Sequence, residues 1–78
     1  MSGGLKKRSL NLAGHATSVA LEPAFWAVLE QMAAERGVVL TRLILEIDAG
    51  RRDQLLASAL RVAALDWARQ QPPEIDQV

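Results

Sequence analysis

The chain of 78 residues contains few side chains that could carry out catalysis. It has no cysteine and no tyrosine, and the sequence places no partner beside its one histidine, His15. One histidine without cysteine cannot supply the nitrogen and sulfur ligands of a usual zinc site. Glu46 and Asp48 lie two positions apart, so on a helix they diverge and do not form an acid–base pair. We therefore expect no enzyme, no cofactor and no metal.

The basic residues near the start of the chain indicate a different chemistry, the binding of phosphate. Lys6, Lys7 and Arg8 are consecutive, and no acidic residue precedes Glu22. The formal net charge is zero, which argues against a uniformly basic nucleic-acid binder. The three bases could follow a phosphate backbone. Equally, they could form a solvated leader that keeps the chain soluble.

Alternating apolar and polar residues predict β-structure between Arg8 and Leu21. The inward positions, two residues apart, are Leu10 and Leu12 before Gly14-His15, and Thr17, Val19 and Leu21 after it. A strand must find a partner for its backbone hydrogen bonds. That partner is either the segment Arg8–Ala13, through a turn at Gly14-His15, or the same strand of a second chain.

Apolar residues at helical spacing predict three helices in the rest of the chain. The first begins at Glu22-Pro23 and ends at Gly37, because proline is tolerated in a first helical turn and glycine commonly ends a helix. The second includes Leu40–Ile47 and ends at Asp48-Ala49-Gly50; its β-branched start leaves a strand at Val38–Leu40 as an alternative. The third includes Leu56–Trp67 and runs to Gln71, where Pro72-Pro73 stops it.

The expected organisation is one small domain with two flexible ends. Residues 1–7 are expected to form a flexible basic arm, residues 8–71 the domain, and residues 72–78 a flexible acidic tail. A chain this short buries only about 60% of its unfolded surface, so without disulfides or metal we expect oligomerisation to help. No apolar run approaches the roughly 20 residues that cross a bilayer, and no signal-peptide segment is evident. We expect a cytoplasmic protein with no membrane partner.

Several of these segments together resemble the ribbon-helix-helix family of bacterial repressors, the Arc type. The resemblance covers Thr17 to about Ile47 and is carried by Thr17-Ser18-Val19-Ala20-Leu21, Phe25, Leu29, Gly37 and Thr41-Arg42-Leu43-Ile44. A second likeness covers nearly the whole chain and is to short stand-alone bacterial proteins of that fold with an added third helix. It is carried by Arg8-Ser9-Leu10 through Gly14-His15, Thr17-Ser18-Val19, Glu22, Trp26, Glu46-Ile47-Asp48 and Ser58-Ala59-Leu60-Arg61-Val62.

The resemblance implies a mainly α fold with a short β-ribbon, an intertwined ribbon-helix-helix homodimer with an additional C-terminal helix. In the family, two protomers pair their strands antiparallel into one ribbon that lies in the DNA major groove, an established docking mode. Val19 and Leu21 would then need the apolar stripes of both protomers to be covered, which implies an obligate homodimer.

The resemblance also implies which residues contact DNA. The outward residues of the ribbon would be Ala16, Ser18 and Ala20, of which only Ser18 can form a hydrogen bond. At the start of the second helix, Thr41 and Arg42 would help backbone amides to bind phosphate. Val39 stands where the family commonly has a capping serine or threonine, and its side chain cannot cap. The full set of expected DNA contacts is Lys6, Lys7, Arg8, His15, Ala16, Ser18, Ala20, Thr41 and Arg42; His15 is otherwise a turn residue.

Two functions follow from these observations. The first is duplex DNA binding, sequence-specific or semi-specific, by a dimeric transcriptional regulator, which the basic segment Lys6–Arg8 favours. The alternative is a dimeric protein-interaction module of the antitoxin kind, with weak or no DNA binding, that holds a protein partner through the third helix or the tail. The alanines at the outward ribbon positions favour this alternative.

Overall fold

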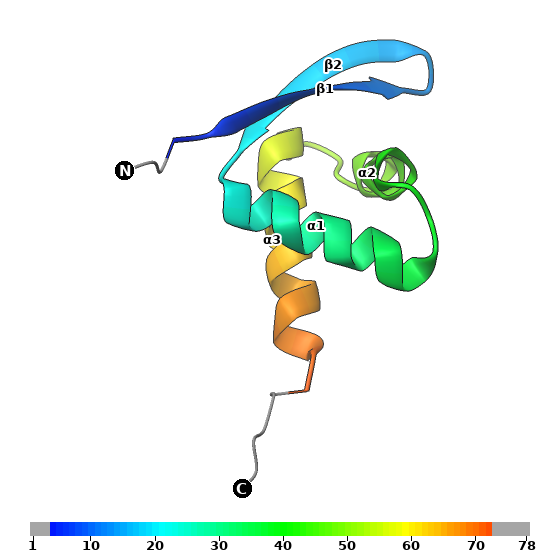
Figure 1. Cartoon of the computed structure of the whole chain (residues 1–78). Helices are drawn as coiled ribbons and strands as arrows, with labels where there is room; N and C mark the ends of the chain where they lie inside the picture. The colour runs from blue at the N-terminus through cyan, green and yellow to red at the C-terminus, as the bar shows by residue number, and fades with distance from the viewer. Residues whose placement is uncertain (1–3, 73–78) are drawn as a thin grey trace, which may run out of the picture.

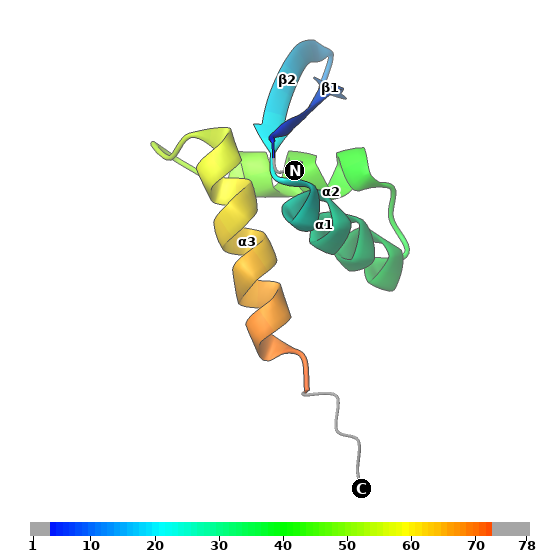
Figure 2. The same ribbon diagram turned by 60° about the vertical axis from the view of Figure 1, so that its left-hand side comes forward.

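The protein consists of a two-stranded ribbon followed by three helices, in a computed structural model that describes residues 4–72 (Figure 1). The elements are β1 (Lys6–Leu12), β2 (His15–Leu21), α1 (Pro23–Arg36), α2 (Leu40–Ala49) and α3 (Leu56–Gln70). The ribbon lies at one end of the molecule above α1 and α2, and α3 runs from the ribbon past α1 (Figures 1 and 2). This arrangement confirms the predicted fold class, apart from its dimeric state. The expected acidic tail lies outside the described residues except for Pro72.

The ribbon is a hairpin within one chain. β1 and β2 pair antiparallel from Leu12 opposite His15 to Lys6 opposite Leu21. Ala13 and Gly14 form the turn, with φ of 53° and 86°, and positive φ at both central residues is the signature of the type I′ turn that suits two-residue hairpins. The Asn11 side-chain oxygen accepts a hydrogen bond from the Gly14 N–H at 3.0 Å. Of the two pairing partners left open, the N-terminal segment of the same chain is the one observed.

The hairpin changes two boundaries predicted from the sequence. The turn is at Ala13-Gly14, and His15 is the first residue of β2. Lys6 and Lys7 belong to β1, whereas the sequence analysis assigned them to a flexible arm. The physical reason is the length of β2: its seven residues offer hydrogen-bonding groups as far as Leu21, and β1 must extend back to Lys6 to pair with all of them.

The helix boundaries agree closely with the predicted ones. Gly37 ends α1 in the left-handed conformation, with φ of 70°, and its N–H donates to the Ala34 carbonyl at 3.1 Å. The Val38 N–H donates to the Ala33 carbonyl at 3.0 Å. Because Val38 completes the end of α1 and Val39 is already the N-cap of α2, the alternative strand at Val38–Leu40 does not form.

The hydrophobic core is assembled from all five elements of a single chain. Val19 and Leu21 on β2 are 6% and 0% exposed. The other buried members of the cluster are Leu12, Trp26, Leu29, Met32, Ala33, Leu43, Ile44, Leu60 and Ala64. The expectation that Val19 and Leu21 need a second protomer to cover them is therefore wrong. α3 packs against both α1 and β2 and supplies Leu60 and Ala64 to this core.

Two polar clusters attach the outer elements to α1. The Trp26 indole N–H donates to the Lys6 carbonyl at 2.8 Å, and the Arg8 guanidinium lies 4.6 Å from the centre of the Trp26 ring. Arg8 also forms a 2.8 Å ion pair with Glu30. These contacts hold β1 against α1, so the ribbon has a defined orientation on the helices.

The second cluster joins α3 to the start of α1. Arg61 forms a 2.8 Å ion pair with Glu22, and its guanidinium lies 5.8 Å from the centre of the Phe25 ring. The Arg61 guanidinium, chiefly through its hydrogen bond, holds the pKa of Glu22 below the usual range. α3 is thereby fixed beside the corner where β2 leads into α1.

The turn gives a first test of the hairpin. Ala13 occupies a left-handed conformation that alanine disfavours and asparagine tolerates. Ala13→Asn should therefore raise the free energy of unfolding by about 0.5–1 kcal/mol, because Asn-Gly is the preferred type I′ sequence. Gly14→Ala should lower it by about 1 kcal/mol, since φ is also positive there. Urea denaturation measures both changes, and an Ala13→Asn variant less stable than the wild type would argue against this turn.

The two faces of β2 give a second test. Leu21→Asp should abolish folding, because an unpaired charge in the core costs more than the few kcal/mol that hold so small a domain together. Ser18→Asp should keep the fold, because Ser18 is exposed. Far-UV circular dichroism distinguishes the two results. An equal loss of helical signal in both variants would mean that the assigned faces are reversed.

Candidate nucleic-acid interface

One face of the ribbon is free of helices and carries half of the hydrogen-bonding side chains of the hairpin. Residues opposite each other in an antiparallel pair lie on the same face. The pairs Lys7 with Ala20, Ser9 with Ser18 and Asn11 with Ala16 share the face opposite to Val19 and Leu21. We call this the outer face; it consists of Lys7, Ser9, Asn11, Ala16, Ser18 and Ala20. All are exposed except Ala20, which is half-buried.

The structure confirms the inward residues of β2, because Val19 and Leu21 are buried and Thr17 is half-buried. It also shows that β1 adds three polar residues beside Ala16, Ser18 and Ala20, namely Lys7, Ser9 and Asn11. Sequence reasoning missed Ser9 and Asn11 as candidate contacts. The alternation of Ser9 and Asn11 with Leu10 and Leu12 already indicates that Ser9 and Asn11 point outward. Placing them beside Ala16 and Ser18 also requires the register in which this segment pairs with β2.

The polar residues of the outer face have the chemistry for contacting a duplex. Lysine binds phosphate or guanine, serine can bond to several base edges, and asparagine pairs with adenine. The side-chain oxygen of Asn11 accepts the hydrogen bond from Gly14 in the turn. The side-chain NH2 group of Asn11 is therefore the group that can donate to a ligand. The two alanines offer methyl groups, which can contact the methyl group of thymine.

The three basic residues predicted to act together lie in different environments. Lys7 is on the outer face. Arg8 is on the opposite face, where Glu30 and Trp26 hold it against α1. Lys6 is exposed and lies opposite Leu21 at the end of the ribbon farthest from the turn. The structure thus places Arg8, and by register Lys6, on the face opposite to Lys7.

His15 and the start of α2 lie apart from the outer face. His15 is exposed beside the turn, opposite Leu12, and so belongs to the inner face of the ribbon by position. Val39 is the N-cap of α2, is 72% exposed and makes no side-chain capping bond, as predicted. The first amides of α2 are therefore not capped by this side chain and resemble an ordinary helix N-terminus, which favours anions. Thr41 and Arg42 follow on α2, which packs against β1.

The charge of Arg42 is shared with an acidic neighbour. Its Nε lies 3.3 Å from Glu46 Oε2, and Glu46 Oε1 lies 2.6 Å from Arg36 Nη2. The hydrogen bond from Arg36, together with the charges of both arginines, holds the pKa of Glu46 below its usual range. Arg42 is nevertheless the most exposed member of this group, so its guanidinium can still reach an external anion.

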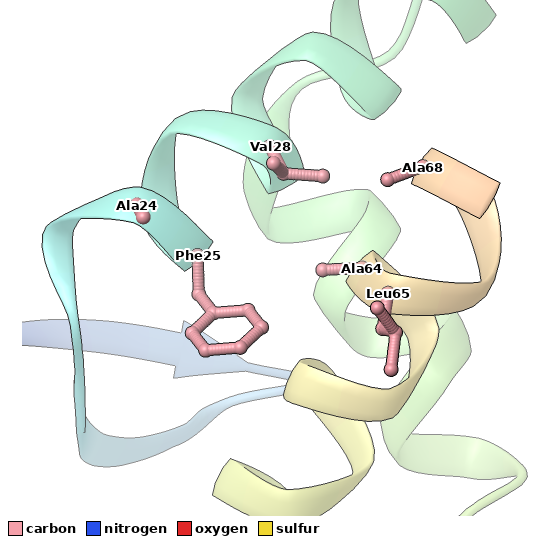
Figure 3. Close-up of a pocket in the computed structure, with 6 residues that line it drawn as sticks. All are labelled: Ala24, Phe25, Val28, Ala64, Leu65 and Ala68. Atoms are coloured by element: carbon pink, nitrogen blue, oxygen red, sulfur yellow. The ribbon is translucent and has the colours of Figure 1, made fainter. Parts of the chain in front are cut away.

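A small apolar pocket lies between α1 and α3, away from the outer face. Its volume is about 150 Å³ and it is lined by Ala24, Phe25, Val28, Ala64, Leu65 and Ala68 (Figure 3). Small-molecule sites usually occupy about 300–1,000 Å³ and include polar groups, so this pocket does not resemble one. Within residues 4–72 no three metal-ligating side chains gather at one place. None of the helices described is long and apolar enough to cross a membrane.

The lowered pKa of Glu46 predicts a dependence of stability on pH. A carboxylate whose pKa is lower in the folded than in the unfolded chain stabilises the fold above its unfolded pKa, here near 4.5. That contribution is lost as the pH falls through the lower, folded value. Glu46→Gln should remove this part of the pH dependence while changing the helical signal little. Thermal unfolding of both proteins between pH 7 and pH 2.5 measures it, and curves that stay parallel below pH 4.5 would contradict it.

Comparison with known proteins agrees with this arrangement. The sequence model of the ribbon-helix-helix domain matches residues 5–68. Among solved structures, the chain is similar to an uncharacterized protein from Bordetella pertussis Tohama I, with 39% sequence identity and a TM-score of 0.73. That match covers 87% of this chain and 58% of the other, so this chain spans little more than half the length of its neighbour. No curated protein matches.

Ribbon-helix-helix domains are typically dimeric, non-enzymatic modules that bind DNA and regulate genes. The match covers β1, β2, α1 and α2 completely and most of α3. With the ribbon and three helices in the order observed, this chain belongs to the ribbon-helix-helix domain family.

Proposed function

We propose that the protein binds duplex DNA through the outer face of its ribbon and acts as a transcriptional regulator. The observation that carries the proposal is the outer face itself, on which Lys7, Ser9, Asn11 and Ser18 are exposed together. Membership of a family whose members typically bind DNA supports it. With this function we also propose a cytoplasmic location.

The ribbon suits the major groove in size as well as in chemistry. The major groove of B-DNA is about 12 Å wide and admits a two-stranded β-ribbon. In our proposal Lys7 neutralises a phosphate, while Ser9, Asn11 and Ser18 contact bases or sugars and phosphates. Ala16 and Ala20 make only apolar contacts, so they let the ribbon approach closely but add little to the discrimination between sequences.

Contacts on the inner face limit the motion of the ribbon, which supports its role in binding DNA. Trp26 and Glu30 hold Lys6 and Arg8 against α1, and Val19 and Leu21 are packed in the core. A ribbon fixed in this way presents its outer side chains without first losing conformational freedom, which reduces the entropic cost of binding. Arg8 accordingly has a structural role in this proposal, and Lys7 carries the phosphate contact of β1.

In this proposal the DNA-binding unit is a homodimer, which is typical of the family. Arg42 and the first amides of α2 then add phosphate contacts from each copy. Val19 and Leu21 are already covered within each chain, so their burial does not require the contact between the two copies.

The alternative function is a protein-interaction module in which α3 holds a protein partner. One observation favours it. Val62 and Leu65 on α3 are 49% and 52% exposed, and Leu65 lines the apolar pocket with Phe25 of α1. An exposed apolar surface of this kind can serve as a contact for another protein. The acidic tail, residues 72–78, is the other segment considered for such a role. Of these residues only Pro72 is among those that the structure describes.

The test of DNA binding is a salt series with the Lys7→Gln variant. Each phosphate contact that is lost should lower the slope of log affinity against log salt by about 0.9, so a homodimer that loses two should lose nearly 2 units of slope. Arg69→Gln is the matched control, because it removes the same charge from an exposed position on α3, at the other end of the molecule. Fluorescence anisotropy with labelled duplexes at 20–200 mM salt measures both variants.

Two outcomes would count against the proposal. Equal slopes for Lys7→Gln and the wild type would show that Lys7 does not contact phosphate. The absence of any duplex binding by the wild type at the lowest salt would reject the DNA-binding function and favour the protein-interaction module.

A further inference from the structure

The apolar pocket between α1 and α3 is large enough to hold one side chain that the described residues do not supply. All six side chains that line it are apolar, and those of Val28, Ala64 and Ala68 point into the space beside the Phe25 ring (Figure 3). Its volume is about 150 Å³, and an apolar cavity of this size can bind benzene. Leu65, which also lines it, is 52% exposed. Covering this surface would therefore remove apolar area from water.

The size of the pocket favours a short occupant. A stable contact between two proteins usually buries more than about 1,000 Å² of surface. Six side chains, three of them alanine, offer room for about one apolar anchor, which would bind weakly from solution. A segment tethered beside the pocket by its own chain is present at an effective concentration in the millimolar range, so the same weak contact can be populated.

The part of the chain that follows α3 starts beside this pocket. α3 ends at Gln70, and the Gln71 N–H donates to the Ala68 carbonyl at 3.3 Å. At about 1.5 Å per residue along the helix axis, Ala64 lies only about 10 Å from Gln71. Ile75 is four positions after Gln71, and an extended chain of that length spans up to about 13 Å. Ile75 is thus within reach of the residues that α3 contributes to the pocket.

The sequence after α3 suits the pocket as well. It reads Pro73-Glu74-Ile75-Asp76-Gln77-Val78, so Ile75 is an apolar residue between two acids. Proline at position 73 is favourable as the second residue of a β-turn, and a turn over residues 72–75 reverses the chain toward α3. In an extended segment successive side chains point to opposite sides, so Glu74 and Asp76 point away from the pocket when Ile75 points into it.

The charges around the pocket are compatible with an acidic segment. Arg69 adjoins Ala68, is exposed and forms no ion pair within residues 4–72. Asp66, the one acidic residue of α3, lies two positions from both Ala64 and Ala68. Residues two apart on a helix do not share a face, so Asp66 points away from the pocket. An acidic segment beside Ala68 therefore meets a positive charge.

We propose that Ile75 occupies this pocket of its own chain, with the acidic tail folded back along α3. Glu74 and Asp76 then stay at the surface, near Arg69. The docked tail covers Leu65, so it competes for this surface with any protein partner that α3 would hold. The contact is separate from the ribbon and does not depend on whether the protein binds DNA.

The composition of the chain allows this contact to be observed directly by NMR. The chain has one phenylalanine, Phe25, and three isoleucines, Ile44, Ile47 and Ile75. In the 78-residue chain we expect a nuclear Overhauser effect between the Ile75 δ1 methyl group and the Phe25 ring. The methyl signal should also move upfield, because it lies against an aromatic ring. Loss of one isoleucine signal in Ile75→Asp assigns that signal to Ile75.

Two variants of the tail separate the apolar anchor from the charge. Ile75→Asp should abolish the contact, and the Phe25 ring signals should then match those of a chain that ends at Pro72. Such a chain keeps the whole core, which lies within residues 4–72. Gln77→Asp is the matched control, because it adds the same charge to the same segment but keeps Ile75. It should leave the contact and the Phe25 ring signals unchanged.

A second pair of variants tests the pocket itself. Ala68→Leu fills it from α3 and should displace Ile75, whereas Ala27→Leu, at an exposed position of α1 outside the pocket, should not. An Ile75 methyl signal at the position of an unstructured peptide, or Phe25 ring signals that are the same with and without Ile75, would overturn the inference. A contact that is found between labelled and unlabelled chains, or that is lost on tenfold dilution, would overturn it too, because the tail would then occupy another copy.

Discussion

The register between β1 and β2 is the constraint on which the rest of this structure depends. A two-residue turn at Ala13 and Gly14 permits one alignment of the strands, and side chains alternate strictly between the two faces. A shift of one residue in either strand would move Val19 and Leu21 from the core to solvent. The same shift would bury Ser18 against the helices. The short turn thus determines both what the ribbon contributes to the core and what it offers to a ligand.

The hairpin also changes how the fold is completed. β1 provides the second strand within the chain, and α3 supplies Leu60 and Ala64 to a core that includes residues from every element. One chain therefore covers its own inner ribbon face. A second copy is not needed to bury Val19 and Leu21. A core shared between chains and a core within each chain can both support the same order of ribbon and helices.

The charged residues of the protein fall into two groups, those that link elements of the fold and those that are available to a ligand. Arg8, Arg36 and Arg61 form ion pairs with Glu30, Glu46 and Glu22, and each pair links two different elements. Exposed ion pairs of this kind contribute little energy individually, but they fix the orientation of the elements that carry them. Lys7 on the outer face takes part in none of these three pairs, so its charge is available to a ligand although the net charge of the protein is zero.

The sequence by itself determined the order and type of the elements. The alternation in Thr17, Val19 and Leu21, the proline at position 23 and the glycine at position 37 are local signals, and local signals specify faces and boundaries. They also identified the outward residues Ala16, Ser18 and Ala20. Only the tertiary structure decided which strand pairs with β2, that Arg8 is held by Glu30 and Trp26, and that Ser9 and Asn11 join the outer face. These facts depend on contacts between residues distant in the chain, such as the 22 positions that separate Arg8 from Glu30, and no periodicity within one segment records them.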